Sequence, residues 1–574
     1  MPFLDPRLGD VEDDASSTKS RSLSGLAGSL LAEISLPKLF AAWLSLVAIP
    51  VLVLGLGPLL ASIWISAAST TVERLFSGLV PIAIGLMLAA AAYFGGRPLF
   101  RLVETNFWSL NALAIQPGYA LVREVLRHVA EGRGGRSRGR GWTALLAGLI
   151  VAAISGAILA LVFPATRWTG TLADLAEPGR LAIAALYNAV AIIAAYVAVA
   201  ALVWGAADAG MAQPEDLADF APREPGGRVF HVAHLSDIHI VGERYGFRIE
   251  SGRAGPRGNE RLARLLACLA AIEAAGELDL VLLSGDMTDA GRAAEWAVFF
   301  DAIAAYPALA KKMVALPGNH DLNVVDRANP ARLDLPLSPG KRLRQMRLVA
   351  ALDRLQGRSV RVVDAATGRP GATLAEALDP HRGEIADFAD AGGMRRGLAL
   401  APLLATVFPM VLPPEATGGL GVVLLNSNAE THFSFTNALG FMPREQEAAL
   451  AALLDADPDG IYLVALHHHV VEYPKPAKAL SERIGTALVN GSWFVRRLLP
   501  FAGRVVVMHG HRHIDWIGRC GPLVIVSAPS PVMNAKDAGT TAFYVHAIGR
   551  TAAGRIALHA PRRIEIEGEA QVEA

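Results

Sequence analysis

Five short polar motifs, each directly after an apolar, β-branched run, constrain the fold of this chain more than any other feature. They occur in one fixed order in the second half of the sequence: Asp237-Ile-His239, Gly285-Asp286-Met287-Thr288-Asp289, Gly318-Asn319-His320-Asp321, His467-His468-His469 and Gly510-His511-Arg512-His513. Open α/β sheets bind their ligands at the carboxyl ends of their strands. We therefore expect all five motifs at the same carboxyl edge of one sheet.

Apolar runs predict the strands of this half, and their length predicts strands that are covered on both faces. The expected strands are Arg228–Leu235, Leu278–Ser284, Lys312–Leu316, Gly421–Asn426, Tyr462–Leu466, Arg504–Met508, Leu523–Ser527 and Ala542–Ala547. Apolar residues at helical spacing predict a helix over Asn259–Ala275, with Asn259 as N-cap and Gly276 as C-cap, and a second helix over Ala293–Ala305. Together these elements predict a layered α/β domain.

The residue types in the motifs indicate a metal centre. Two divalent ions held about 3.5–4 Å apart need a bridging carboxylate, several imidazoles, and open positions for a water and a phosphoryl oxygen. Asp286 is the obvious bridge. Carboxylate, carboxamide and imidazole ligands without thiolate suit manganese, iron or zinc, and the sequence does not choose among these metals.

The five motifs together resemble the calcineurin-like metallophosphoesterase superfamily over roughly residues 228 to 550. This resemblance implies a β-sandwich flanked by helices. It implies a first metal held by Asp237, His239, Asp286 and His513. It implies a second metal held by Asp286, Asn319, His467 and His511.

The resemblance also implies a mechanism, in which a hydroxide between the two metals attacks phosphorus. His320 would protonate the leaving group or stabilise charge on the phosphoryl oxygens, as a positioned imidazole can. Asp321 would orient His320.

The run of three histidines leaves one assignment to be made, because a strand sends neighbouring side chains to opposite faces. The family's usual ligand is the first residue after the strand, which favours His467. His468 and His469 are candidates for supporting the ligands or facing the substrate, with ordinary polar residues at a strand end as the alternative.

An arginine-rich loop, Gly242–Arg261, follows the first motif closely. Arginine forks bind phosphate well, which makes Arg244 and Arg248 candidates for binding substrate, alongside His468 and Asp321; a solvated basic loop is the alternative.

About a hundred residues separate Asp321 from the strand at Gly421, far more than ordinary connections in compact domains, so residues 322–420 predict an insertion that forms a lid or cap. Within it, Lys341–Leu355 predicts a basic amphipathic helix. The apolar stretch Leu398–Leu412 indicates an interaction surface or a membrane-facing patch, with a simply packed insertion as the alternative.

The first two hundred residues are of a different kind. Hydrophobic residues make up 52% of the chain, and the excess is concentrated in four uncharged runs. Each is long enough to cross a bilayer core, which needs about 20 residues, so we expect an all-α region of four transmembrane helices. Buried helices of a soluble domain are the alternative. The runs are Leu39–Ile65, Leu75–Gly96, Gly141–Thr166 and Leu181–Ala207.

Arginine placement predicts the orientation of these helices. The loop 97–140 is rich in arginine, whereas the loops at 66–74 and 167–180 are poor in positive charge. The positive-inside rule then places the loop 97–140, the N-terminus and the catalytic half in the cytoplasm. The stretch Phe107–His128 is amphipathic enough to lie along the membrane surface.

The expected organisation is a disordered cytoplasmic tail, a membrane region, a linker, the phosphoesterase domain and a C-terminal tail. Their boundaries are 1–37, 38–207, 208–227, 228–560 and 561–574. The two cysteines, Cys268 and Cys520, argue against a disulfide framework and agree with a reducing compartment. The zero net charge gives no indication of a nucleic acid partner.

The wording of the motifs is closest to that of bacterial cyclic-nucleotide and glycerophosphodiester phosphodiesterases of the superfamily. The resemblance therefore implies a phosphodiesterase with a phosphate ester as substrate. The apolar runs and the arginine placement add the expectation of a multi-pass inner-membrane protein, with the lipid bilayer as a partner. One alternative is hydrolysis of a phospholipid or lipid-linked pyrophosphate at the inner leaflet, because lipid A precursor pyrophosphatases share the metal motifs, although some carry arginine where this chain has His320. The other is a non-catalytic metal-binding membrane sensor. The substrate and the oligomeric state stay open.

Overall fold

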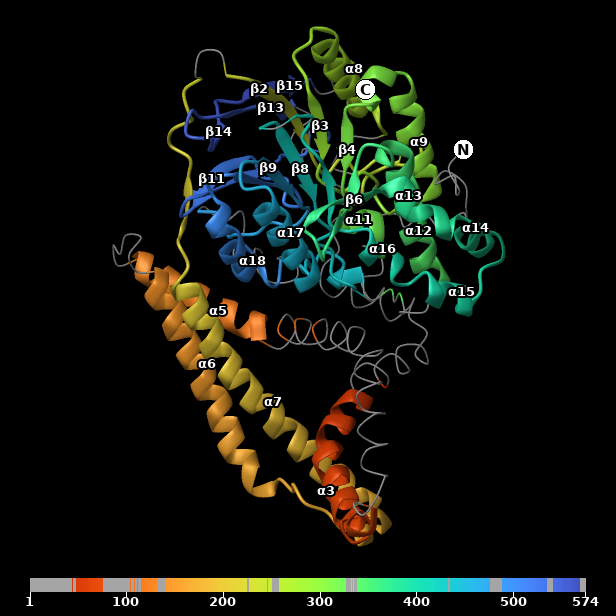
Figure 1. Ribbon diagram of the computed structural model, residues 1–574. Coiled ribbons are helices and arrows are strands. Elements are labelled where there is room, and N and C mark those ends of the chain that lie inside the picture. Colours follow the sequence, from red (N-terminus) through yellow and green to blue (C-terminus); the bar gives the residue numbers. More distant parts are fainter. Residues whose placement is uncertain are drawn as a thin grey trace, which may run out of the picture. The chain divides into compact units, whose positions relative to one another are not determined.

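The described residues fall into two compact units, one within Glu33–Met211 and the other from Ala212 onward (Figure 1). The computed structural model describes residues 44, 48–75, 104, 108, 111, 115–132, 140–223, 227–244, 246–249, 258–326, 332, 334, 338–416, 418–431, 434–474, 488–533 and 540–567. The predicted tail at 1–37, nearly all of the second apolar run and the arginines at 133–139 lie outside these residues.

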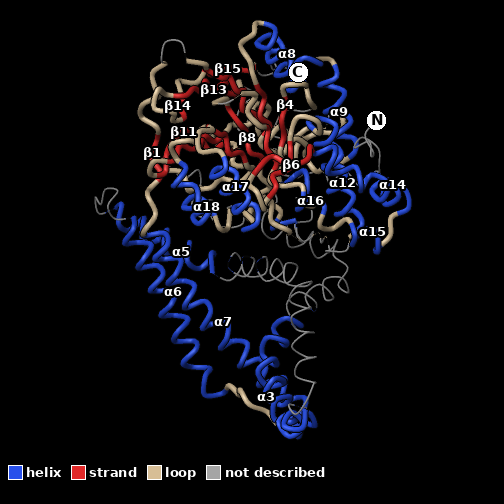
Figure 2. The backbone as a smooth tube through the Cα atoms, in the orientation of Figure 1, coloured by secondary structure: helices blue, strands red, loops and turns tan. Residues whose placement is uncertain are grey.

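The first unit is helical (Figure 2). The helices among its described residues are α3 (Ile49–Leu75), α5 (Gln116–Gly132), α6 (Arg140–Val162) and α7 (Pro178–Ala209), with the 3-10 turns η4 (Phe163–Ala165) and η5 (Leu172–Ala176) between the last two. Small residues let α6 and α7 approach closely: a Cβ on Gly148 would lie 2.6 Å from the carbonyl oxygen of Ala201. The polar Asn188 is buried on α7, where its side chain binds the backbone of Gly55 and of Arg167.

Within the described residues, two helices are long and apolar enough to cross a membrane, Gly141–Ala165 and Pro178–Ala209. Four were expected, so the four-span prediction is supported only for its third and fourth runs. The first run is described in part, as the apolar stretch Ile49–Trp64 of α3.

The second unit contains two mixed sheets. Parallel strands form the centre of the larger sheet, and in the smaller sheet they reach one edge. The nine-stranded sheet has the order β1 (Pro214–Asp216), β11 (Trp516–Cys520), β12 (Leu523–Ser527), β10 (Val505–His509), β9 (Ile461–Ala465), β8 (Leu420–Leu424), β7 (Met410–Leu412), β5 (Arg361–Asp364), β6 (Arg369–Thr373). The six-stranded sheet has the order β14 (Ile556–Leu558), β13 (Thr541–Arg550), β2 (Val229–Leu235), β3 (Leu280–Leu283), β4 (Met313–Ala315), with β15 (Arg562–Ile566) also paired to β13.

Each of the eight predicted strand segments overlaps an observed strand, but the expectation of one sheet is wrong. The first three motifs follow β2, β3 and β4 of the six-stranded sheet, and the last two follow β9 and β10 of the nine-stranded sheet. Buried residues of both sheets, such as Leu283 and Val506, belong to one hydrophobic cluster. The motifs can therefore meet because two sheets share a core.

Helices cover these sheets, and the two predicted ones are present as α8 (Glu260–Ala274) and α9 (Ala293–Ala304). Asn259 occupies the N-cap position of α8, but its side chain binds the backbone N–H and carbonyl of Val241 in place of capping the helix. The remaining helices outside the insertion are α10 (Pro307–Ala310), α11 (Asn319–Leu322), α17 (Arg444–Ala456), α18 (Gly491–Leu498), and the 3-10 turns η8 (Ser434–Thr436) and η9 (Leu499–Phe501).

The insertion at 322–420 extends the nine-stranded sheet, because β7, β5 and β6 continue it beyond β8. Its helices are α12 (Pro339–Gln356), α13 (Leu374–Leu378), η7 (Asp379–His381), α14 (Arg382–Ala391), α15 (Met394–Ala399) and α16 (Leu403–Thr406). Two expectations for it are corrected. The helix predicted as amphipathic is buried on nearly all sides, including the fully buried Arg347, and in the apolar stretch Leu400, Val407 and Met410 are core residues. Most of the stretch is therefore packed, as the alternative expected, although Leu398 at its start is 51% exposed.

Two segments predicted as a linker and a tail contain paired strands. The segment 208–227 contains β1, which pairs with β11, and the segment 561–574 contains β15, which pairs with β13. β1 consists of Pro-Glu-Asp and has no apolar alternation from which a strand could be predicted. In β15, Ile564 and Ile566 do alternate with charged residues, and this signal was missed.

Candidate metal centre

The ligand candidates are held in an unusual backbone conformation. Among the described residues, the non-glycine residues with positive φ are Asp237 (56°), His239 (46°), Asp286 (51°), His511 (72°) and His513 (53°). Left-handed backbone is unfavourable for such residues and persists only where the surroundings impose it, which is typical of functional sites. The sharp turns after β2, β3 and β10 aim these side chains at one another.

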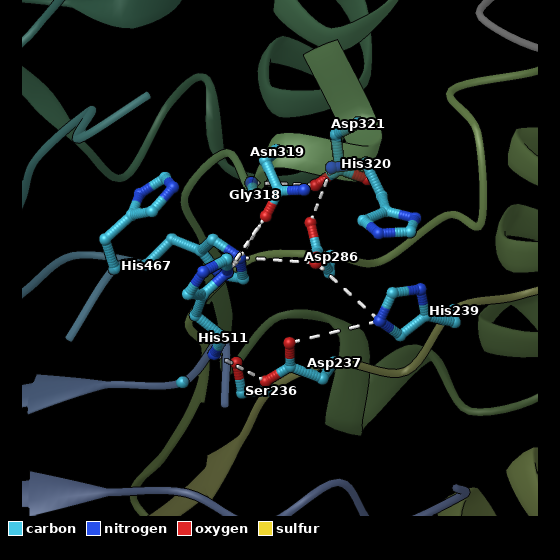
Figure 3. A network of polar contacts seen from close by, with 12 residues as sticks. Ser236, Asp237, His239, Asp286, Gly318, Asn319, His320, Asp321, His467 and His511 are labelled. Carbon is cyan, nitrogen blue, oxygen red and sulfur yellow. Dashed lines mark hydrogen bonds and ion pairs between the residues drawn. The ribbon is translucent and has the colours of Figure 1, made fainter. Parts of the chain in front are cut away.

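Asp286 lies at the centre of the site, and its two carboxylate oxygens have different partners (Figure 3). Oδ1 accepts a hydrogen bond from the backbone N–H of His320 at 2.8 Å. Oδ2 lies 3.6 Å from Nε2 of His239 and 3.2 Å from Nε2 of His467. One oxygen is thus fixed by the backbone, and the other faces two imidazoles from different sheets.

The two carboxylate oxygens of Asp237 also have different partners. Its Oδ2 accepts a hydrogen bond from the backbone N–H of His511 at 2.9 Å, and its Oδ1 lies 3.2 Å from Nε2 of His513. Asp237, His239 and His513 therefore form one cluster, whose ligand atoms all lie within 4.8 Å of one another.

Asp286, His467 and His511 form a second cluster of the same kind. Asn319 completes it, because its Oδ1 lies 3.0 Å from Nε2 of His467 and 3.0 Å from Nδ1 of His511. Nδ1 of His467 lies 2.9 Å from the carbonyl oxygen of Ser284, which fixes this nitrogen as a donor and leaves Nε2 for the centre.

These residues fit divalent ions. Oδ1 of Asp237 and Nε2 of His239 are buried, yet neither forms a hydrogen bond. Burial raises the pKa of Asp286, but the positive charge of His467 and His320 outweighs it and holds the pKa below its ordinary value. Burial lowers the pKa of His239, which favours the neutral imidazole that a metal requires.

His320 is placed beside this centre by Asp289. Nδ1 of His320 lies 2.7 Å from the backbone carbonyl oxygen of Asp289, and its ring packs edge-on against His239 with centroids 4.4 Å apart. A carbonyl oxygen only accepts, so Nδ1 carries a proton and Nε2 is the nitrogen on the opposite side of the ring.

The expected partner of His320 was Asp321, and the structure gives Asp321 another role. Its carboxylate accepts hydrogen bonds from the backbone of Gly318 and Thr288 and from the Thr288 hydroxyl. It therefore ties the second motif to the third. Sequence reasoning missed Asp289, whose Oδ1 lies 3.3 Å from Nδ1 of His239. Its position at the end of the second motif was the available signal.

The other residues that the sequence suggested as substrate contacts are His468, Arg248 and Arg244. His468 is fully buried, with Nδ1 2.9 Å from the Ser427 hydroxyl. Arg248 is 1% exposed and points Nε at the carbonyl of Ile238. Arg244 lies in the described part of the loop. His467, the chosen member of the triple histidine, is the one in the second cluster.

Comparison with known proteins agrees with this arrangement. Residues 230–374 match the family described as Calcineurin-like phosphoesterase. The chain therefore contains a calcineurin-like phosphoesterase domain, and its class is that of metal-dependent phosphoester hydrolases. No curated protein matches the chain.

Two solved structures share weak similarity with the chain. A Staphylococcus aureus protein assigned as a 5′-nucleotidase aligns at 12% identity over 60% of this chain and 56% of that chain, with a TM-score of 0.31. A purple acid phosphatase from yellow lupin (Lupinus luteus) seeds aligns at 11% identity over 60% of this chain and 55% of that chain, with a TM-score of 0.25. The chain thus spans little more than half of either protein, and neither likeness carries the functional argument.

The buried carboxyl group of Glu295, next to the site, makes the stability of the folded protein depend on pH. Glu295 accepts hydrogen bonds from the backbone N–H groups of Ala290 and Arg292, and burial together with Asp289 raises its pKa to about 8 from 4.5. The folded state holds the proton of Glu295 more tightly than the unfolded state does. The stabilisation that results is therefore complete below pH 4.5 and is lost as the pH rises through about 8.

We expect Glu295→Gln to flatten the fall in Tm across this pH window, because the amide keeps an acceptor oxygen and does not ionise. Thermal unfolding followed at a series of pH values checks it. An identical pH slope in both proteins would contradict the assignment.

Proposed function

We propose that this protein is a membrane-anchored phosphodiesterase that uses two divalent metal ions. The observation that carries the proposal is the position of Oδ2 of Asp286, between Nε2 of His239 and Nε2 of His467. One carboxylate oxygen serves two ligand sets, which is the arrangement that a dinuclear centre needs.

The chain's own residues have separable roles in this proposal. Asp237, His239 and His513 hold one ion, Asn319, His467 and His511 hold the other, and Asp286 is common to both. Bound ions of this kind polarise a phosphoryl oxygen and lower the pKa of water. The backbone N–H groups of His320 and His511 fix the carboxylates so that one oxygen of each faces the centre. Nε2 of His320 is the candidate proton donor to the leaving group.

The contacts of two arginines near the site, Arg248 and Arg261, favour a phosphodiester over a phosphomonoester as the substrate. Among the described arginines of the loop, Arg248, a candidate for binding substrate phosphate, points at the carbonyl of Ile238, and Arg261 donates to the carbonyl of Val532. A monoester dianion needs additional cationic groups more than a diester monoanion does. The residues of the five motifs, which are most similar to those of bacterial phosphodiesterases of the superfamily, also favour a diester.

The exposed faces of α6 and α7 support the membrane anchor. A helix in a soluble core is mostly buried, whereas Leu161 and Val199 are 82% and 63% exposed. Exposed aromatic residues mark both ends of α6, Trp142 near its start and Phe163 just after its end. These are 21 residues apart, which at 1.5 Å per residue is about 31 Å, close to the thickness of a bilayer core. We propose the inner membrane, with the catalytic unit in the cytoplasm.

The substrate class is tested on full-length protein, in detergent and in vesicles. With Mn²⁺, we expect kcat/KM for bis-p-nitrophenyl phosphate to exceed that for p-nitrophenyl phosphate by about tenfold, equivalent to about 1.4 kcal/mol in the barrier. A preference for the monoester would overturn the diester assignment. Turnover of vesicle phospholipid or lipid-linked pyrophosphate above that of the soluble diester would favour the lipid hydrolase. Metal binding without turnover on any of these substrates would favour the sensor.

A further inference from the structure

The segment between the last membrane helix and the catalytic unit is built into both sheets. We call residues 212–221 the strap; it begins three residues after α7 ends at Ala209. Its first part is β1, which pairs with β11 at the edge of the nine-stranded sheet, and the N–H of Leu217 continues this pairing to the carbonyl of Ile517 at 3.0 Å. Its last residue, Ala221, donates to the carbonyl of Leu558 at 2.9 Å, at the edge of the six-stranded sheet.

Neighbouring side chains of the strap have different partners. Asp216 is exposed, yet it accepts a hydrogen bond at 3.0 Å from the indole N–H of Trp516, whose side chain is buried. Glu215 is also exposed and forms an ion pair with Arg519 at 3.2 Å. Successive residues of a strand point to opposite sides, so only Asp216 lies on the side of Trp516.

From Trp516, a row of ring contacts leads to the metal centre. Its ring packs edge-on against Tyr473 with centroids 5.4 Å apart. Tyr473 stacks on His469 at 6.0 Å, and His469 stacks on His511 at 6.0 Å with an interplanar angle of 12°. The row ends on the candidate ligand with the largest positive φ among the non-glycine residues described, 72°.

A second connection supports the same loop. The Tyr473 hydroxyl lies 2.9 Å from the hydroxyl of Ser527, which donates to the carbonyl of Ile514 at 2.8 Å. Ile514 directly follows His513. The Tyr473 ring also contacts His509 and Trp516, which flank the loop that carries His511 and His513.

We infer that Asp216 is a positioning residue for this site, acting through Trp516, Tyr473 and His469 on His511. A left-handed ligand loop needs surroundings that impose its conformation, and the strap fixes the outer end of the ring row. The inference rests on the proposed metal-dependent function. It also explains why a segment so close to α7 is part of the catalytic fold.

The test compares three variants of the full-length protein. Asp216→Ala removes the acceptor for the Trp516 indole, Asp216→Asn retains an acceptor oxygen, and Glu215→Ala removes the outward side chain of the same strand as the matched control. Mn²⁺ affinity is measured by calorimetry and the bound metal is counted by elemental analysis. Loss of a group that orients a metal ligand typically weakens metal binding 10–100-fold.

We expect Asp216→Ala to weaken binding of one of the two ions by about tenfold, and Asp216→Asn and Glu215→Ala to bind as the wild type does. Trp516→Phe should reproduce the loss, and the double variant Asp216→Ala/Trp516→Phe should lose no more than either single change. The single variant Trp516→Phe still tests the inference if Asp216→Ala does not fold, because phenylalanine retains a ring that can pack against Tyr473. Unchanged metal affinity in Asp216→Ala and Trp516→Phe would overturn the inference, as would an equal loss in Glu215→Ala.

Failure of the proposed function gives a different result. A wild-type protein that binds two Mn²⁺ ions without hydrolysing any ester overturns catalysis, and the strap variants still report on metal affinity. A wild-type enzyme that is active while its strap variants keep full metal affinity overturns the strap inference alone.

Discussion

Asp286→Asn is expected to lower kcat/KM for a phosphodiester by at least about 1,000-fold, or about 4 kcal/mol in the barrier, and to reduce bound metal from two ions to one or none. The amide has a single oxygen, and the backbone N–H of His320 already binds the oxygen at the Oδ1 position at 2.8 Å. With its oxygen held there, the amide presents an NH2 group to His239 and His467. Nitrogen protons cannot bind a cation, so the bridge between the two ligand sets is lost.

Asp279→Asn is the matched control for this change. Asp279 lies just before β3, the strand that Asp286 follows, and its side chain is 44% exposed beside His231. It should retain wild-type turnover and both metals. Elemental analysis and steady-state kinetics on the same samples check both variants. Two bound ions and near wild-type turnover in Asp286→Asn would remove Asp286 as the shared ligand.

The residues of the two candidate metal clusters could be predicted because their signal is local in sequence. A polar motif directly after an apolar strand marks a strand end, and the resemblance then selected Asp286 and His467 within their motifs. The pairing of those strands is not local: nothing in the runs that precede His467 and Asp286 distinguishes one sheet from two. Burial of Leu283 and Val506 in one cluster, which only the folded chain shows, brings the two groups of motifs together.

The arginines and the strap show why the rest could not be predicted. Charge is visible in sequence, but burial is not, so Arg248 and Arg347 were expected at surfaces and are buried. Asp289 acts on His320 through its backbone carbonyl, a contact that leaves no side-chain signature. The strap has the composition of a linker, because an edge strand three residues long has no hydrophobic period to detect.

The second large effect on turnover is expected from a substitution at Gly318, which has no side chain that could bind a metal. A Cβ on Gly318 would lie 2.1 Å from both the backbone nitrogen and Oδ1 of Asp286. The backbone of Gly318 is extended, with φ of −97°, which alanine adopts readily, so the cost of Gly318→Ala is purely steric. The clash pushes α11, with Asn319 and His320, away from the turn after β3.

We expect Gly318→Ala to lower turnover at least about 100-fold, equivalent to about 3 kcal/mol in the barrier, although every ligand is retained. Its Tm should fall, because overpacking a tight site typically costs 1–3 kcal/mol. Excess Mn²⁺ should restore part of the activity, since metal binding favours the arrangement that the methyl group opposes. Kinetics across a Mn²⁺ titration and thermal unfolding measure these effects.

Gly383→Ala is the control, because a Cβ at this position on α14 meets nothing within 4 Å. In a helix, alanine is favoured over glycine by about 1 kcal/mol, so this variant should keep wild-type turnover and a Tm equal to or above that of the wild type. Turnover of Gly318→Ala within about threefold of the control, less than 1 kcal/mol in the barrier, would mean that the third motif tolerates displacement from Asp286. A loss that excess Mn²⁺ partly reverses would instead place the defect in the distance between the motifs, since the ligands themselves are unchanged.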